Sequence, residues 1–511
     1  MEFLVVIPLP STNSETLPVD VEILNDPTSV TYPAKSVNLV QSGNISIWMY
    51  SRDSTVPTNE PVINDNGIFL AKGTAIVDGK GIPNSEETFN QLKRNNTQVQ
   101  GDYLLFGLEH NGDGEIFTTT MTFCPLFVHQ CSTHTVLSTD IGLLNKCLTS
   151  RRDSDVIQFF DVDYIYESIE NEWGTRVFPE KTMFKDISRA LTTTRYWFSD
   201  YQLLSKSVQY DLFRKDLEEL YLKDKQLFYD HCFEIIEKSI RAVFEQLRDS
   251  KIELLMSGGL DSRLSTVLVN HVAADYNVSL YATMFGPVDH PDVVIGKRVT
   301  DLMDIPSENK TGDGKIWKPR SIEDYRRGME VSWGDWSSNN WRTSKIFQER
   351  LVISGQDNYK RHNWAKIFSM NRWYAARMSY TSTIPILSHQ IINDMILIYG
   401  KHDFHKAMFE FAYELMKRYN PDVLEIPLVG MEIPQHPIPA YSSVRESKMM
   451  PSIDAEAFFD EELAISLLNR LRFNGDRIVT IDSILTDKRK KRIIMDFASL
   501  MDESHVAWIR G

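Results

Sequence analysis

The sequence is poor in cysteine and contains no long apolar run. Its 511 residues hold four cysteines, which form no C-x-x-C pair and no metal-type spacing: Cys124, Cys131, Cys147 and Cys232. We therefore expect free thiols in a reducing compartment. No apolar run reaches the roughly 18 residues that suggest a membrane-spanning helix. The chain starts with an acidic residue and too short an apolar run for a signal peptide, so we expect a first strand and a cytoplasmic protein.

Positive charge is also scarce. The chain has 70 acidic and 55 basic residues and a formal net charge of −15, which opposes non-specific binding to nucleic acid. Its one dense basic tract, Asp487 to Arg492, is interpreted as a solvated helix face. The common phosphate-binding loop is missing as well, because the nearest candidate, Gly73 to Gly81, has the wrong spacing and lacks the hydroxyl. A nucleotide site would need a different loop.

One stretch, Ile252 to Ser262, runs from apolar residues directly into glycines, hydroxyls and a carboxylate. Its first residues, Ile252 to Met256, predict a buried parallel strand, and Arg263 to His271 predict the helix that follows. Gly258 and Gly259 allow the backbone to approach a ligand closely. Free N–H groups and the positive end of the helix dipole then point at one spot, which favours the binding of oxygen anions.

Three side chains add to the chemistry of this loop. Ser257 and Ser262 provide hydroxyl donors, whereas Asp261 would repel a polyphosphate unless a divalent cation lies between them. The loop therefore predicts binding of a nucleotide together with Mg²⁺. On the residues alone a second interpretation stays open, a tight Gly-Gly turn with a serine or aspartate cap.

The pattern beyond about Ser205 is helical and then alternates between strand and helix. The stretch Phe228 to Leu247 carries apolar residues spaced by three and four, which mark one face of a helix. After the strand that begins at Ile252, Val278 to Met284 predict a second strand and Asp292 to Met303 a second helix. This order is typical of a parallel sheet.

A third strand-to-loop transition, Arg350 to Asn358, repeats the logic of the first. An apolar run ends there in Ser354, Gly355 and Asp357. Carboxylates at two strand ends can hold the hard cation that ATP requires, since Mg²⁺ binds through one or two carboxylates plus phosphate oxygens. Asp261 and Asp357 provide such a pair.

The chain before about Arg151 has a different pattern, and 511 residues are too many for one ordinary core, so we expect two domains or more. Short alternating runs between turn residues predict antiparallel sheets. The expected strands are 44–50, 68–76, 103–108, 116–122, 126–130 and 135–138. Asn111 to Gly114 predicts a hairpin turn, since Asn and Gly accept positive φ. Helices are scarce here, and Glu86 to Lys93 is the clearest.

The hexapeptide from Ser257 to Ser262 resembles the pyrophosphate loop of the ATP pyrophosphatases, which cleave ATP between the α and β phosphates and transfer AMP to a substrate oxygen. Three upstream segments, Gln100 to Leu108, Pro125 to Val128 and Phe178 to Ile187, are similar in order and spacing to asparagine synthetases. The chain therefore resembles the asparagine synthetase-like family, which includes β-lactam synthetases and lasso peptide cyclases.

This resemblance implies a fold class for each half of the chain. Residues 1–205 would form a glutaminase-like antiparallel sandwich, an α+β unit rich in β-structure. Residues 206–511 would form an α/β unit with a parallel sheet, of the ATP-pyrophosphatase or adenine nucleotide α-hydrolase-like type. ATP and Mg²⁺ are the implied cofactors.

The start of the chain departs from this family. There, glutamine hydrolysis depends on a cysteine at position two, which becomes the N-terminal residue after methionine removal. Here position two is Glu2, and Cys124 is the nearest cysteine in sequence. We therefore expect no glutaminase activity and an N-terminal domain kept as a structural relic.

The resemblance assigns roles to individual residues beyond the loop. Thr283 and Met284 would lie near the adenine, with an ordinary strand and loop as the open alternative. Gly355 would contact the nucleotide, and Asp357 would be the second Mg²⁺ ligand beside Asp261.

Further positions concern proton transfer and the phosphates. A lysine that contacts the ATP phosphates in the family falls near Lys448, with Lys406 as a competing candidate. Gln356 stands where the family has an acidic residue or a tyrosine, and an amide cannot take up a proton at neutral pH. Tyr359 and Tyr380 are the candidates for a base that removes a proton from the amine.

Together these observations predict an AMP-forming amide-bond synthetase. This ligase would adenylate a small-molecule or peptide carboxylate with ATP and Mg²⁺ and pass the acyl group to an amine or ammonia. Two alternatives stay open: a nucleobase-modifying ATP pyrophosphatase, which the acidic charge and the missing C-x-x-C disfavour, and a catalytically inactive scaffold, which Gln356 motivates. We expect no membrane partner, and homo-oligomer formation is left open.

Overall fold

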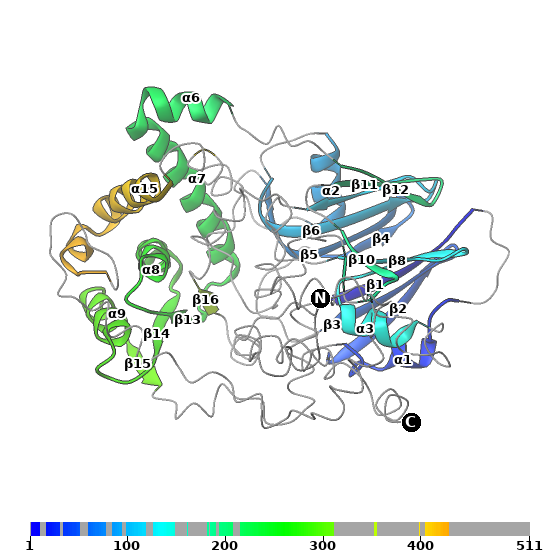
Figure 1. The fold of residues 1–511 in the computed structure, drawn as a ribbon, viewed down its shortest axis with the longest axis horizontal. Helices are drawn as coiled ribbons and strands as arrows, with labels where there is room; N and C mark the ends of the chain where they lie inside the picture. The colour runs from blue at the N-terminus through cyan, green and yellow to red at the C-terminus, as the bar shows by residue number, and fades with distance from the viewer. Residues whose placement is uncertain are drawn as a thin grey trace, which may run out of the picture.

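The protein is a mixed α/β structure with two antiparallel sheets in the first half of the chain and a smaller parallel sheet further along (Figure 1). The computed structural model describes residues 2–10, 17–30, 34–51, 60–77, 84–94, 99–118, 126–148, 161, 181–182, 184–190, 194–207, 215–310, 352–354, 398 and 404–428. No helix in these ranges has the length and apolar character needed to cross a membrane.

The first antiparallel sheet has the start of the chain at its centre. Its strand order is β10-β8-β9-β1-β3-β2. The bounds are β1 (Glu2–Pro8), β2 (Ser36–Ser42), β3 (Ile45–Ser51), β8 (Phe127–Gln130), β9 (His134–Ser138) and β10 (Ile187–Arg189). Leu4 of β1 is paired with Trp48 of β3 on one side and with Ser138 of β9 on the other. The predicted first strand is therefore an inner strand.

The second antiparallel sheet has the order β12-β11-β7-β6-β5-β4. Its strands are β4 (Val62–Asn64), β5 (Gly67–Val77), β6 (Val99–Glu109), β7 (Gly114–Thr118), β11 (Thr194–Ser199) and β12 (Gln202–Ser207). The predicted turn at Asn111 to Gly114 joins β6 to β7, and Gly112 has φ +87°, a conformation that glycine adopts readily. Strand β12 ends at Ser207, close to the predicted domain boundary.

The two sheets pack face to face, and short helices cover their outer faces (Figure 1). The core between the sheets is formed by apolar side chains of both, among them Phe3, Ile47, Leu70 and Phe106. Helix α2 (Ser85–Lys93) packs on β5 and β6, while α1 (Val21–Asn25) and α3 (Ile141–Cys147) lie against the first sheet. Because both faces of the central strands are buried, β1 and β3 consist of nearly continuous apolar residues.

The parallel sheet has the strand order β15-β14-β13-β16. Its strands are β13 (Lys251–Leu255), β14 (Ser279–Phe285), β15 (Ser307–Lys310) and β16 (Val352–Ser354). The chain moves outward from β13 to β14 and β15, and β16 then pairs with the free side of β13. The strand order therefore reverses direction between β13 and β16.

Helices pack in layers beside this sheet. Its strands are contacted by α8 (Leu260–Ala273) and α9 (Pro291–Leu302); α7 (Lys225–Gln246) and α15 (Phe404–Tyr419) pack on α8, and α6 (Lys215–Lys223) packs on α7. The 3-10 turns are η3 (Ala274–Tyr276) and η5 (Pro421–Glu425). Ile252, Leu254 and Met256 belong to one buried cluster with apolar residues of α7, α8, α9 and α15. Since side chains alternate along a strand, Glu253 points to the opposite face.

Most elements predicted in this half lie where the sequence placed them. The periodic apolar residues of α7 are buried, with Phe228, Cys232 and Ile236 each at 0% exposure. The strand β15 was not predicted, because its sequence Ser-Glu-Asn-Lys has no apolar residue. Among the described residues, Cys131, Cys147 and Cys232 are not joined in disulfides.

Candidate functional site

The strands that precede the two predicted aspartates in sequence end at the same edge of the parallel sheet. Leu255 of β13 is in register with Ser354 of β16, so these neighbouring parallel strands end side by side. In open α/β sheets, ligands bind outside the carboxyl ends of the strands at the point where the strand order reverses. That point lies between β13 and β16. The residues after Ser354, including Gly355 and Asp357, lie outside the described ranges.

The loop between β13 and α8 is held by hydrogen bonds among its own hydroxyls and amides. The Ser257 and Ser262 hydroxyl oxygens are 3.0 Å apart, and Ser262 Oγ lies 3.1 Å from the Ser257 carbonyl oxygen, to which it donates. The Ser257 amide donates to Ser262 Oγ at 3.3 Å, and the Gly259 amide donates to Ser257 Oγ at 3.3 Å. The two predicted serines thus fix the loop conformation.

Helix α8 begins in this loop without a side-chain cap. Its N-cap is Gly259, whose φ of −80° and ψ of 170° are extended and which has no side chain to accept a hydrogen bond from the first turn. The first amides of a helix have no partner within the helix, and the dipole adds positive charge there. Asp261 lies in this first turn, but its side chain is outside what the structure describes.

Among the described residues, the backbone of Gly259 has one close neighbour. A β-carbon placed at Gly259 would meet Ser257 Oγ at 3.4 Å, which is ordinary van der Waals contact, and no other described atom within 4 Å. The start of α8 and the hydroxyls of Ser257 and Ser262 are together suited to an oxygen anion.

The first turn of α9 also contacts this loop. Asp292 accepts a hydrogen bond from the Gly258 amide, with Oδ1 3.2 Å from the nitrogen. The N-cap of α9 is His290, whose Nδ1 accepts from the Asp292 amide at 3.2 Å. Sequence reasoning placed Asp292 only at a helix start and missed this contact, since no local signal joins residues 34 positions apart.

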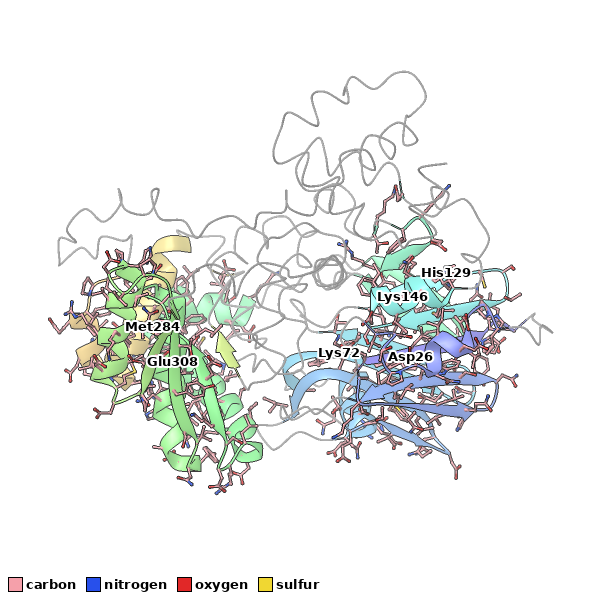
Figure 2. All side chains as sticks on the ribbon, turned by 90° about the horizontal axis from the view of Figure 1, so that it is seen from below. Asp26, Lys72, His129, Lys146, Met284 and Glu308 are labelled. Atoms are coloured by element: carbon pink, nitrogen blue, oxygen red, sulfur yellow. The ribbon has the colours of Figure 1, made fainter. Side chains whose placement is uncertain are left out.

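The predicted adenine-side residues have buried side chains. Thr283 is fully buried, and its hydroxyl donates to the carboxylate of Glu253 on the adjacent strand. Met284 is 1% exposed and lies against Gly296 of α9. Met284 and Glu308 of β15 are labelled in the parallel-sheet part of the molecule in Figure 2. Any contact of Thr283 or Met284 with a nucleotide must therefore use their backbone.

Glu253 is a second residue that the sequence reasoning passed over. It is a buried carboxylate between the apolar residues Ile252 and Leu254, and it accepts hydrogen bonds from Thr283 and from the Tyr281 hydroxyl, the latter at 3.1 Å. These three residues form a polar cluster on the face of the sheet opposite α8 and α9. Its donors come from the neighbouring strand β14, which the sequence of β13 alone does not reveal.

Arg263, in the second turn of α8, is a third residue without a sequence signal. It is 1% exposed and donates to the carbonyl oxygens of Ile426 at 2.5 Å and Pro427 at 2.7 Å. Burial, the larger cause, and the positive charge of Arg298 lower the pKa of Arg263 to about 10. Arg263 ties the helix of the candidate site to the segment after η5.

Several predicted site residues lie outside the described ranges, namely Gly355, Asp357, Tyr359, Tyr380 and Lys448. The competing candidate Lys406 is in α15, where its side chain is not described. Within the part of the chain that the structure describes, no three His, Cys, Asp or Glu side chains gather as a metal site. The Mg²⁺ ligands therefore stay a prediction.

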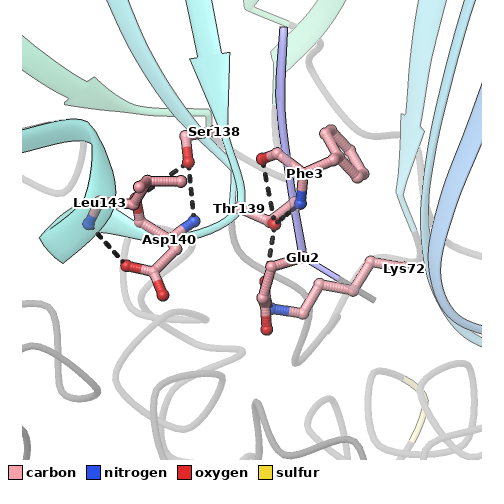
Figure 3. A network of polar contacts seen from close by, with 7 residues as sticks. All are labelled: Glu2, Phe3, Lys72, Ser138, Thr139, Asp140 and Leu143. Carbon is pink, nitrogen blue, oxygen red and sulfur yellow. Dashed lines mark hydrogen bonds and ion pairs between the residues drawn. The ribbon is translucent and has the colours of Figure 1, made fainter. Parts of the chain in front are cut away.

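At the start of the chain, Glu2 takes part in a buried polar network (Figure 3). Its Oε2 is 2.6 Å from Lys72 Nζ and accepts a hydrogen bond from the Thr139 hydroxyl at 2.6 Å. The Phe3 amide donates to the same hydroxyl at 3.0 Å. Position two therefore anchors β1 to β5 and to the end of β9.

Comparisons with known proteins do not identify this chain. No family model and no curated protein matches it. One solved structure, described as the allosteric regulatory enzyme of purine biosynthesis, is similar over 73% of this chain and 78% of its own, with 8% sequence identity and a TM-score of 0.26. At that score the likeness supports no conclusion about this protein.

Proposed function

We propose that this protein is an AMP-forming amide-bond synthetase that binds ATP where β13 and β16 end. The observation that carries the proposal is the reversal of strand order between these strands, with the Ser257 to Ser262 loop at that point. The loop resembles the pyrophosphate loop of ATP pyrophosphatases, and the chain resembles asparagine synthetases in particular. These resemblances suggest the reaction type.

The phosphates of ATP would lie over the start of α8. The first-turn amides, the uncapped end of the helix and the hydroxyls of Ser257 and Ser262 favour oxygen anions there. Asp261 and Asp357 would hold Mg²⁺, which neutralises phosphate charge when bound. Lys448 would contact the same phosphates, and Gly355 the nucleotide. The backbone after Thr283 and Met284 would border the adenine.

The reaction proceeds in two steps, adenylation of the carboxylate and transfer of the acyl group to the amine. A substrate carboxylate oxygen attacks the α-phosphorus of ATP, the bond between that phosphorus and the bridging oxygen breaks, and pyrophosphate leaves. An amine nitrogen then attacks the acyl carbon, AMP leaves with the carboxylate oxygen, and the nitrogen loses a proton. Positioning the carboxylate in line with the phosphorus can contribute roughly 7–11 kcal/mol. Tyr359 is the candidate base.

The N-terminal unit would take no part in nitrogen supply. Glu2 provides no nucleophile, and its carboxylate is engaged by Lys72 and Thr139 inside the sandwich. The amine would therefore arrive as part of a substrate or as free ammonia. The carboxylate donor would be a small molecule or a peptide.

The test is product formation by the intact protein. It would be incubated with α-labelled ATP, Mg²⁺ and a panel of amino acids, other carboxylic acids and peptides, with hydroxylamine as a general amine. We expect AMP and pyrophosphate in equal amounts and a hydroxamate of one carboxylate. Asp261→Asn should abolish all three products.

Asp304→Asn provides the matched control. Asp304 is an exposed aspartate after α9 with φ +55°, a conformation that asparagine accepts. This variant should retain full activity. AMP formation with RNA and with no carboxylate would instead favour a nucleobase-modifying enzyme, and no AMP with any addition would favour an inactive scaffold.

A further inference from the structure

We propose that Asp292 makes the phosphate site selective for metal-complexed phosphates. Its carboxylate accepts the hydrogen bond of the Gly258 amide, which a phosphate oxygen would otherwise accept. The inference rests on the proposed function of the Ser257 to Ser262 loop. It adds a specificity-determining residue that comes from a different helix, α9.

The amides of Ser257, Gly258 and Gly259 each donate to a side-chain oxygen of the protein. The Ser257 and Gly259 amides donate to neutral hydroxyls of the loop itself, each at 3.3 Å. The Gly258 amide donates to Asp292 Oδ1 at 3.2 Å. All three bonds are longer than the usual 2.9–3.0 Å of an N–H···O bond, so a stronger acceptor can replace them.

Among these acceptors, Asp292 alone carries a charge and alone belongs to another element. A carboxylate presents to an amide the same kind of oxygen that a phosphate presents. The Asp292 side chain is 40% exposed, so solvent can receive it when it leaves the amide. Its own amide is held by His290 Nδ1, which keeps the backbone of this turn in place when the side chain moves.

The position of Asp292 gives it opposite effects on bare and metal-complexed phosphates. A bare phosphate that approaches the Gly258 amide meets a negative charge within a few ångströms, and the two repel each other. A phosphate that carries Mg²⁺ brings a positive charge to which the displaced carboxylate is attracted. The carboxylate therefore disfavours metal-free anions and tolerates the Mg²⁺ complex.

The test compares pyrophosphate binding with and without Mg²⁺. Dissociation constants would be measured by titration calorimetry for the intact protein and for Asp292→Asn, which keeps an oxygen acceptor for Gly258 but removes the charge. In the wild type, Mg²⁺ should lower the dissociation constant of pyrophosphate by at least tenfold. This is roughly the effect of removing the repulsion between the Asp292 carboxylate and one phosphate charge a few ångströms away. In Asp292→Asn, binding of metal-free pyrophosphate should strengthen by about tenfold, while binding of the Mg²⁺ complex should change by less than about threefold.

Asp301→Asn is the matched control, because Asp301 lies in the same helix, is exposed and forms an i,i+4 pair with Lys297. This variant should leave both dissociation constants unchanged. Asp292→Ala, which also removes the acceptor, should strengthen metal-free binding as Asp292→Asn does.

Three outcomes overturn the inference. Equal Mg²⁺ dependence in wild type and Asp292→Asn would show that the carboxylate does not discriminate, while the proposed function would stand. The same strengthening in Asp301→Asn would assign the effect to net charge. Failure of the wild type to bind pyrophosphate in either condition would refute the proposed function together with the inference.

Discussion

The buried ion pair between Lys72 and Glu2 gives a quantitative test of the role assigned to the start of the chain. The two side chains are 6% and 5% exposed, and Nζ and Oε2 are 2.6 Å apart. Lys72→Met keeps most of the aliphatic stem but removes the charge beside a buried carboxylate. Removal of one partner of a buried pair costs about 3–5 kcal/mol.

This cost converts to a shift in melting temperature. For a unit of 150–250 residues, about 1 kcal/mol lowers Tm by roughly 2–4 °C. The variant should therefore melt about 6–20 °C below the wild type in the transition of the antiparallel sheets. The measurement is thermal unfolding of the intact protein by circular dichroism, with hydrogen exchange of the β1 amides to assign the transition.

Two further variants make the result specific. Lys93→Met removes a cation from an exposed pair with Glu109, whose side chains are 50% and 32% exposed, and such a pair contributes about 0–1 kcal/mol. Combining Lys72→Met with Glu2→Gln should recover most of the lost stability, since a neutral buried pair carries no uncompensated charge. Equal shifts for Lys72→Met and Lys93→Met, or no recovery in the double variant, would refute this reasoning.

Three other predictions follow from the described residues. The intact protein should release no ammonia from glutamine, because Glu2 replaces the nucleophile; glutamate formation in a coupled assay would contradict this. Arg263→Met should lower the free energy of unfolding by about 2–4 kcal/mol, because the buried carbonyls of Ile426 and Pro427 lose their donor, and Arg263→Lys should lower it less. Equal denaturant midpoints for wild type and Arg263→Met would contradict this. Gly296→Val should lower the free energy of unfolding by about 1–3 kcal/mol and weaken nucleotide binding, because a β-carbon there would lie 3.1 Å from Met284 Sδ and 3.4 Å from the Ser257 carbonyl carbon. An unchanged Tm and an unchanged nucleotide affinity would contradict this.

The sequence was informative wherever local pattern and tertiary environment agree. The apolar spacing of α7 and the alternating runs of the antiparallel strands predicted which faces of these elements are buried, and those faces lie in the cores. The strands β2, β4, β10, β12 and β15 were not predicted; they lie at sheet edges, where polar residues tolerate solvent. The strand β11, next to the edge strand β12, was not predicted either. The places of β10 and β11 in the sheets come from pairing with the distant strands β8 and β7.

The candidate site was predicted in part. The loop from Ser257 to Ser262 follows β13 as expected, and the strand leading to Asp357 ends beside it. Asp292 and Arg263 were missed for one reason: each acts through a residue far away in sequence, Gly258 in one case and Ile426 in the other. A single sequence carries no local record of such contacts.

The most direct test of the central claim is a titration of the intact protein with ATP and Mg²⁺, compared with Gly259→Val. The backbone at Gly259 has φ −80°, which any residue adopts, and among the described atoms a β-carbon there would touch only Ser257 Oγ, at 3.4 Å. The added side chain should therefore leave Tm nearly unchanged while it fills the space next to the first turn of α8. We predict that the wild type binds with a Kd of about 1 μM to 1 mM and that Gly259→Val shows no binding. Equal affinity in the two proteins would contradict the claim that the phosphates lie over this loop.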